Sequence, residues 1–256
     1  MKRCVLMMLV VCLTSTFAVA QQEEEPPIPP KRSKAAKVGA FGGFTPGWLF
    51  VDVKPINEFL QPAKGAALKD NGVFLWGGGG AAYIMLVPNL RVGGAGMSGA
   101  IKSTSLDASG IRRDAELNVG FGGVTFEYVV PIVERLDVAF GTMIGGGGID
   151  ITLRQDVGGS KTWGQEWNNF GSGNYQVLGQ VNNVKRTMSG AFFVWMPSVN
   201  VEYAILGWVG VRLGASYVGM ASPSWTIDDN NELLGVPSKV TGKGFMVNAG
   251  VFVGTF

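Results

Sequence analysis

Hydrophobic and polar residues alternate with a period of two along most of this chain, which is the pattern of β-strands whose two faces differ. Residues 134–144 show the pattern clearly. One face of that segment carries Leu136, Val138, Phe140 and Ile144, and the other carries Arg135, Asp137, Ala139 and Gly141. The same pattern predicts eight strands, at residues 36–50, 72–86, 89–103, 113–130, 134–155, 189–205, 207–222 and 239–256.

The length of these strands and the connections between them indicate a membrane barrel. The strands are about 15 residues long, whereas a strand of a soluble protein usually has about 5–6 residues and a membrane-spanning strand needs about 9–11. Their connections are alternately short, at 87–89, 131–135 and 206–207, and long, at 51–71, 104–112, 156–188 and 223–238. Outer-membrane barrels have short turns on one side and long loops on the other. The sequence therefore predicts an all-β fold, a transmembrane up-and-down antiparallel β-barrel of eight strands, with ten strands as the alternative.

The N-terminus has the parts of a secretory signal peptide. A basic start is followed by an apolar run at residues 5–14 and by Ala18-Val19-Ala20, which matches a cleavage site. We expect residues 1–20 to be removed. A lipoprotein signal at Cys12 and an uncleaved anchor helix are the alternatives.

The segment after the signal peptide differs in composition from the rest. Residues 21–35 are charged and proline-rich, which predicts a disordered periplasmic leader before a barrel of residues 36–256. Both cysteines lie in the signal peptide, so the mature chain would contain none. Removing Lys2 and Arg3 from 21 basic residues leaves 19, which equals the 19 acidic residues. A net charge near zero predicts no nucleic-acid partner.

The chain ends in Phe256, after the alternating stretch GFMVNAGVFVGT. With the signal peptide and the alternating strands, this ending resembles bacterial outer-membrane β-barrel proteins of the small up-and-down type, such as the OmpA membrane domain, OmpX and OmpW. The resemblance implies a Gram-negative outer membrane, contact with its lipid, and insertion by the barrel-assembly machinery, which reads Phe256. Gly250 and Gly254 depart from it, because the family usually has apolar residues on that face.

The composition restricts the chemistry that the chain can perform. There is no histidine, which excludes a Ser–His site and a histidine metal site, and we expect no enzyme activity and no cofactor. Asp228 and Asp229 form a solvated turn or a loop calcium site, and Asp114 and Glu116 are expected as interior or rim charges. Residues 94–99 match the dinucleotide fingerprint, but no βαβ unit surrounds them.

Six charged residues are predicted to point into the lumen near the periplasmic end. They are Arg91, Glu127, Arg135, Asp137, Glu202 and Arg212. Since charges in a narrow lumen require partners, we expect a paired network that plugs the barrel. A gated or selective constriction is the alternative interpretation.

Three tyrosines, Tyr83, Tyr128 and Tyr203, each lie a few residues before a predicted short turn. Amphipathic rings gather at the membrane–water interface. This spacing predicts a periplasmic aromatic belt.

The apolar face changes parity at two glycine clusters. It is even-numbered up to Ile144 and odd-numbered from Ile149, and a similar change follows Phe121. A slip of one residue moves every side chain to the other face unless a bulge absorbs it. Strand kinks that keep one apolar belt facing lipid are therefore predicted at Gly122, Gly123, Gly145, Gly146, Gly147 and Gly148.

The longest predicted loop, residues 156–186, is rich in small polar residues and also contains Trp163, Trp167, Phe170 and Tyr175. This composition suits adhesion or sugar contact, and equally an ordinary surface loop. Two functions follow for the whole chain. One is a structural or surface-interaction role through extracellular loops, and the other is a narrow porin-like channel for small or apolar solutes.

Overall fold

The structure of the protein is a computed structural model that describes residues 39–63, 65–156, 162–164, 184–228 and 231–255. The predicted signal peptide and leader, most of the loop at 156–186, and Phe256 lie outside the described residues. Among the described residues, no helix has the length and apolar character needed to cross a membrane.

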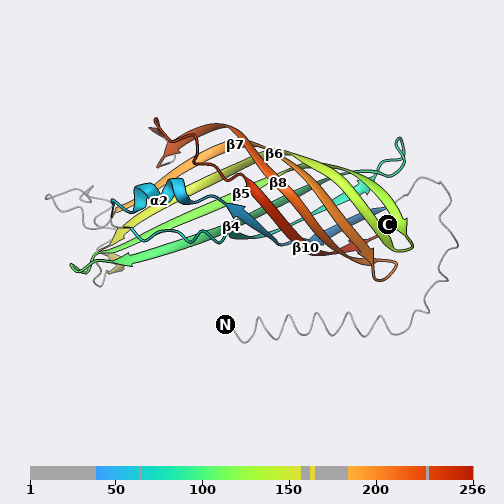
Figure 1. The fold of residues 1–256 in the computed structure, drawn as a ribbon, viewed down its shortest axis with the longest axis horizontal. Coiled ribbons are helices and arrows are strands. Elements are labelled where there is room, and N and C mark those ends of the chain that lie inside the picture. The colour runs from blue at the N-terminus through green and yellow to red at the C-terminus, as the bar shows by residue number, and fades with distance from the viewer. Residues whose placement is uncertain (1–38, 64, 157–161, 165–183, 229–230, 256) are drawn as a thin grey trace. The chain divides into compact units, whose positions relative to one another are not determined.

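The described strands form one closed antiparallel ring (Figure 1). They are β1 (Ala40–Phe44), β2 (Gly47–Val51), β3 (Val73–Tyr83), β4 (Leu90–Leu106), β5 (Arg112–Val133), β6 (Leu136–Asp156), β7 (Val184–Ala204), β8 (Val209–Ile227), β9 (Asn231–Glu232) and β10 (Gly244–Gly254). Consecutive strands pair from β3 to β8, β8 pairs with β10, and both β1 and β2 pair with β10 and β3.

Strands β1 and β2 are two halves of one barrel strand. Both keep the same register against β10, as Phe44 pairs with Val251 and Gly47 with Asn248. Pro46 lies in the gap between them, and proline has no N–H to donate to a neighbouring strand. Strand β9 has two residues and pairs only with the end of β8. The ring therefore has eight strands, and the predicted eight-stranded up-and-down barrel is confirmed.

The short and long connections lie at opposite ends of the barrel (Figure 1). The short turns, at residues 84–89, 134–135 and 205–208, define what we call the short-turn end, and the long segments leave from the loop end. Helix α2 (Lys54–Leu60) belongs to the first long segment. Pro55 lies in its first turn, where a helix has no N–H partner to lose.

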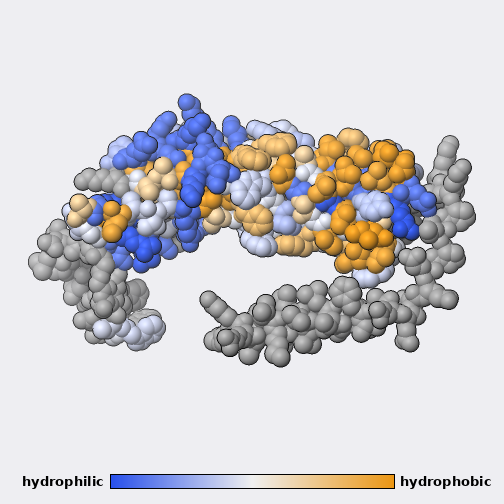
Figure 2. Space-filling view, turned by 60° about the horizontal axis from the view of Figure 1, so that its bottom comes forward, coloured by the Kyte–Doolittle hydropathy of each residue, from blue (hydrophilic) through white to orange (hydrophobic). Residues whose placement is uncertain are grey.

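Apolar side chains cover the outside of the half of the barrel next to the short turns. Every strand of the ring except β4 exposes large apolar residues there, among them Trp48, Phe74, Phe126, Phe140, Val201, Leu213 and Val251. Strand β4 presents Val92, Gly94 and Gly96 on this side. Figure 2 shows the hydrophobic surface gathered toward the short-turn end and the hydrophilic surface toward the loop end. We call this zone the outer belt.

The two faces exchange character in the loop half of the barrel. Its interior is an apolar core that includes Leu117, Val119, Phe121, Ile149 and Phe192. Helix α2 and the residues beside it add Val53, Ile56 and Leu60 to this core. The outward positions on β5 are instead Asp114, Glu116 and Asn118. This half thus has the apolar inside and polar outside of a water-soluble barrel.

This exchange corrects the prediction that strand kinks at the glycine clusters, with a bulge that absorbs one residue, keep one apolar belt facing lipid. The pairing of β5 with β6 runs unbroken through them, with Gly122 opposite Gly146 and Gly123 opposite Gly145. The register of this pair shifts only between Pro131 and Val133. No residue is inserted, so the change of parity is a real change of face: Phe121 is buried inside and Val124 is exposed outside.

Glycine is required at these positions because the two strands approach each other closely. A Cβ atom on Gly145 would lie 2.0 Å from the carbonyl oxygen of Gly122, and one on Gly123 would lie 2.3 Å from that of Ile144. Both distances are far inside van der Waals contact. The inward glycines therefore permit tight curvature of the wall between β5 and β6.

The strands are longer than a membrane requires. Strand β5 has 22 residues, which at about 3.3 Å per residue and a tilt of roughly 35–45° spans about 50–60 Å along the barrel axis. The apolar band of an outer-membrane barrel is about 25 Å tall. About half of the barrel therefore extends beyond such a band, in agreement with the exchange of faces along β5.

Candidate functional site: the interior charge network

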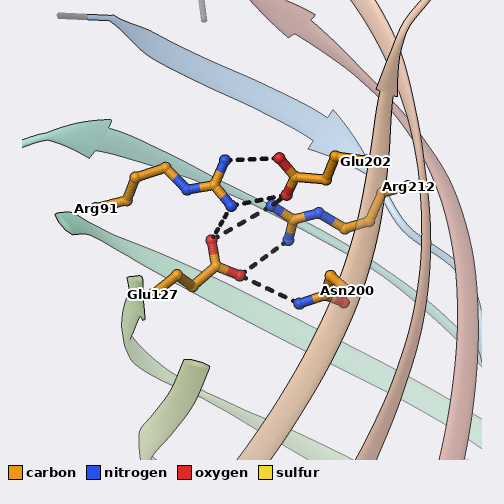
Figure 3. A network of polar contacts seen from close by, with 5 residues as sticks. All are labelled: Arg91, Glu127, Asn200, Glu202 and Arg212. Atoms are coloured by element: carbon orange, nitrogen blue, oxygen red, sulfur yellow. Dashed lines mark hydrogen bonds and ion pairs between the residues drawn. The ribbon is translucent and has the colours of Figure 1, made fainter. Parts of the chain in front are cut away.

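Four charged side chains, Arg91, Glu127, Glu202 and Arg212, meet inside the barrel (Figure 3). Arg91 donates two hydrogen bonds to Glu202, from Nη1 to Oε2 at 2.8 Å and from Nη2 to Oε1 at 2.7 Å. Its Nη2 also lies 2.8 Å from Oε2 of Glu127. Arg212 reaches both carboxylates, at 3.2 Å from Glu127 and 2.5 Å from Glu202. Each arginine thus contacts each glutamate.

The network is buried and its formal charge is balanced. The Arg91 side chain is completely buried, and Glu127 and Glu202 are each 5% exposed. Asn200, also buried, donates a hydrogen bond to Oε1 of Glu127 at 3.4 Å. Removing four charges from water is costly, and only paired, well-oriented hydrogen bonds offset that cost. The bidentate Arg91–Glu202 pair has this geometry.

Aromatic rings complete the surroundings of the two guanidinium groups. The Arg91 guanidinium carbon lies 4.8 Å from the centroid of Phe41 and 5.7 Å from that of Tyr83. The corresponding carbon of Arg212 lies 5.2 Å from the same Phe41 ring. Cations over ring faces are attracted by the ring quadrupole. Phe41, which the sequence reasoning missed, therefore contacts both arginines.

Strand pairing and barrel closure each contribute part of this arrangement. Arg91 on β4 is directly opposite Glu127 on β5, and Glu202 on β7 is directly opposite Arg212 on β8. Neighbouring strands thus form two ion pairs locally. The contacts that join these pairs cross the interior, because β5 and β7 are separated by β6. Only the closed ring brings them together.

Of the remaining two predicted lumen charges, Arg135 lies at the rim and Asp137 lies beside the network, on the same face of β6 as the buried Ala139 and Met143. Arg135 occupies the turn between β5 and β6 with φ of 68°, and its Nη1 donates to the carbonyl oxygen of Ile205 at 3.5 Å. Its expected position in the lumen network is therefore corrected to the rim of the short-turn end. Asp137 lies on β6, opposite Glu202 in the strand register.

The predicted tyrosine belt also needs one correction. Tyr128 and Tyr203 point outward and are about half exposed, at 49% and 46%. Tyr83 is buried and faces the interior, packed with Val129 and Ala139. The reason is its position on β3, whose inward residues are odd-numbered: Val73, Leu75, Ala81 and Tyr83.

A second group of aromatic residues lies on the outside, toward the loop end of the outer belt. Phe44 stacks on Trp76 with centroids 5.7 Å apart, and Phe74 meets the same ring edge-on at 4.9 Å. Trp48 contacts Phe74 and donates from Nε1 to the carbonyl oxygen of Asn71 at 2.7 Å. The sequence signal was available in the i, i+2 spacing of Phe74 and Trp76.

A cavity lies between the charge network and the apolar core. It has a volume of about 60 Å³, enough for a few water molecules, each of which needs roughly 10–15 Å³. Glu127 and Arg212 line one part of it, and Met97, Met143 and Met196 line another. Asn248 also lines it, and its Oδ1 has no hydrogen-bond partner among the described residues.

The described acidic residues of the two carboxylate pairs form ion pairs and hydrogen bonds with neighbouring protein groups. Asp228 forms an ion pair with Arg186 and accepts a hydrogen bond from the backbone N–H of Thr187. Asp114 accepts from Arg112 and Thr104 on the outer wall near the loop end of β5, so its expected place in the interior is corrected and its place near the rim stands. Asp229 lies outside the described residues. Within the described part of the chain, no three His, Cys, Asp or Glu residues group as a metal site.

Comparisons with known proteins give similarity at low identity. No family model and no curated protein sequence matches the chain. Neisserial surface protein A has 12% identity and a TM-score of 0.37 over 85% of this chain and 97% of its own. CarO of Acinetobacter baumannii has 12% identity and a TM-score of 0.37 over 87% and 99%. A major outer membrane protein of Thermus thermophilus has 11% identity and a TM-score of 0.42 over 84% and 98%.

Proposed function

We propose that this chain is an integral outer-membrane β-barrel protein with a closed lumen and a structural or surface-interaction role carried by its loop end. The observation that carries the proposal is the outer belt: exposed rings and aliphatic side chains surround one half of a closed ring of strands. Exposed apolar surface of this extent is unfavourable in water and favourable in contact with lipid. The closed ring leaves no unpaired edge in the bilayer.

The filled interior favours display over transport. In the belt half, Arg91, Glu127, Glu202 and Arg212 occupy the lumen, and in the loop half the apolar core does so. Helix α2 adds Ile56 and Leu60 to that core. A porin-like channel, the alternative function, has less support, because both halves would have to open together.

The loop half is suited to carry surface loops at a distance from the bilayer. Its outer wall is polar, and side-chain contacts join β4 to β5 there: Lys102 pairs with Glu116 at 3.1 Å, and Thr104 donates a hydrogen bond to Asp114 at 2.7 Å. Asn57 donates to the carbonyl oxygen of Leu68 at 3.0 Å and accepts from its N–H at 2.8 Å, which holds the segment after α2 in place. These contacts give the loops a rigid base.

Two measurements test the proposal. The refolded protein should migrate differently on a gel when unheated and when boiled, and should insert into lipid vesicles with a β-sheet circular dichroism spectrum. In a planar bilayer the inserted protein should show no discrete openings. A water-soluble protein that does not bind vesicles would refute the membrane assignment, and steady single-channel steps would favour the channel.

A further inference from the structure

Apolar side chains are exposed in the first and third short turns and at the end of β5, just before the second. Met85 and Leu86 in the first turn are 74% and 92% exposed. At the second turn Ile132 and Val133 are exposed, and at the third Leu206 and Trp208 are exposed. We call these six residues the apolar rim. All lie in or beside the turns between β3 and β4, β5 and β6, and β7 and β8, at the short-turn end of the barrel.

The geometry of the turns does not demand these residues. Turn positions favour Gly, Asn, Asp, Ser and Pro for conformational reasons. In the first turn that need is met by Pro88 and by Asn89, whose φ is 64°, and in the second by Arg135 at 68°. The exposed apolar side chains beside them therefore reflect the surroundings of the rim and not the folding of the turns.

The rim continues the outer belt without a polar interruption. On β7 the outward residues Val199, Val201 and Tyr203 lead directly to Ile205 in the turn, and all four are exposed. On β5, Phe126 and Tyr128 lead to Ile132 in the same way.

Charge is scarce at this end of the barrel. Within the turns at 84–89, 134–135 and 205–208, only Glu134 and Arg135 are charged. The Arg135 guanidinium contacts the carbonyl oxygen of Ile205, so one of these two charges is partly satisfied within the rim. A surface of this kind matches the boundary between lipid headgroups and acyl chains.

The height of the apolar zone agrees with that position. On β7 it runs from Ala191 to Ile205, which at about 3.3 Å per residue and a tilt of roughly 35–45° corresponds to about 35–40 Å along the axis. The apolar band of an outer-membrane barrel is about 25 Å tall, and a bilayer with its headgroups measures about 40–45 Å. The zone therefore ends within the headgroup layer and not in bulk water.

From the exposure, the continuity and the height together, we infer that the apolar rim is immersed in the lipid interface, so that the short-turn end does not project from the membrane. This inference rests on the proposed function. On this inference, lipid covers the apolar rim. A soluble protein with an apolar face, or a second copy of the chain, is the competing partner for the rim. All of the strand length that exceeds the bilayer then lies on the loop side.

Spin labels at single cysteines test the inference in phosphatidylcholine–phosphatidylglycerol vesicles. The full chain carries Cys4→Ala and Cys12→Ala, and receives one label at Leu86→Cys or at Ile132→Cys. Lys102→Cys on the polar outer wall reports water, and Val199→Cys in the outer belt reports the bilayer. Each variant is first shown to keep its heat-dependent gel shift.

The measured quantity is the ratio of collision rates with oxygen, which enriches in lipid, and with a water-soluble nickel chelate. We expect the ratio at positions 86 and 132 to be several-fold higher than at position 102 and to approach that at position 199. Rim labels that match position 102 while position 199 stays in lipid would overturn the inference and favour a protein partner or a second copy. If position 199 is also accessible to nickel, the proposed membrane function itself fails.

Discussion

Arg91 and Glu202 are 111 residues apart in the sequence and face each other inside the barrel, joined by two hydrogen bonds of 2.8 and 2.7 Å. Each also contacts the other ion pair, formed by Glu127 and Arg212. The four side chains link β4, β5, β7 and β8. The network therefore ties together strands that are not all neighbours in the sheet.

Removing Arg91 should destabilise the barrel strongly. Arg91→Met leaves two buried glutamates with one arginine, and breaking a buried pair in this way costs about 3–5 kcal/mol. Urea unfolding in detergent measures the loss. The charge-balanced variant Arg91→Met/Glu202→Leu keeps the Arg212–Glu127 pair and should recover most of it. A single variant as stable as the wild type would contradict a structural role for the network.

Arg212→Ala should change stability more than permeability. It removes the contacts to Glu127 and Glu202, but the apolar core of the loop half, with Phe121 and Ile149, still fills the interior. Unfolding in detergent and leakage of small dyes from vesicles are measured on the same preparation. Unchanged stability with strongly increased leakage would identify the network as the barrier and support the channel.

Two adjacent glycines should respond differently to the same substitution. Gly145→Ala places a Cβ atom 2.0 Å from the carbonyl oxygen of Gly122, whereas the nearest atom to a Cβ at Gly146 is 3.9 Å away. We expect Gly145→Ala to destabilise the barrel by about 1–3 kcal/mol. Gly146→Ala should be neutral or stabilising by up to about 1 kcal/mol, because alanine restricts the unfolded chain. Equal effects in urea unfolding would refute the close-approach argument.

The β4–β5 loop should keep its structure to low pH. Asp107 accepts hydrogen bonds from the backbone N–H groups of Ser109 and Ile111 and from Arg113, and the bond from Arg113 contributes most to lowering the pKa of its carboxyl. A lowered folded-state pKa means that this stabilisation is present above the ordinary aspartate pKa and disappears as pH falls through the lower, folded value.

Hydrogen exchange at the amides of Ser109 and Ile111 measures this dependence. Protection should persist below the pKa of an ordinary aspartate and then fall. In Asp107→Asn it should be weaker and should not change over that range. A midpoint at or above the ordinary aspartate pKa would contradict the assignment.

Much of the candidate site could be predicted from the sequence because strand pairing is local. Arg91 and Glu127, and likewise Glu202 and Arg212, belong to neighbouring strands of an up-and-down barrel, so their pairing follows from the order of the strands. Arg135 was misplaced because the strand predicted to begin at residue 134 begins only at Leu136, so Arg135 belongs to the turn. Tyr83 was misplaced because amphipathic rings suit either a lipid interface or a cation inside the barrel.

The alternating pattern by itself determined the strand number, the antiparallel order and the two ends of this barrel, since period-two hydrophobicity and connection length are local properties. In the loop half of the barrel, which face of each strand is the inside was decided only by the tertiary structure. Leu117 and Phe126 are both large and apolar, yet one packs in the core and the other faces outward. The reason is physical: an apolar side chain is stabilised by leaving water, whether it enters a protein interior or contacts lipid. Closure of the ring determines which face of a strand points inward. The position of a residue along its strand then determines whether an apolar side chain there packs in the core or faces outward.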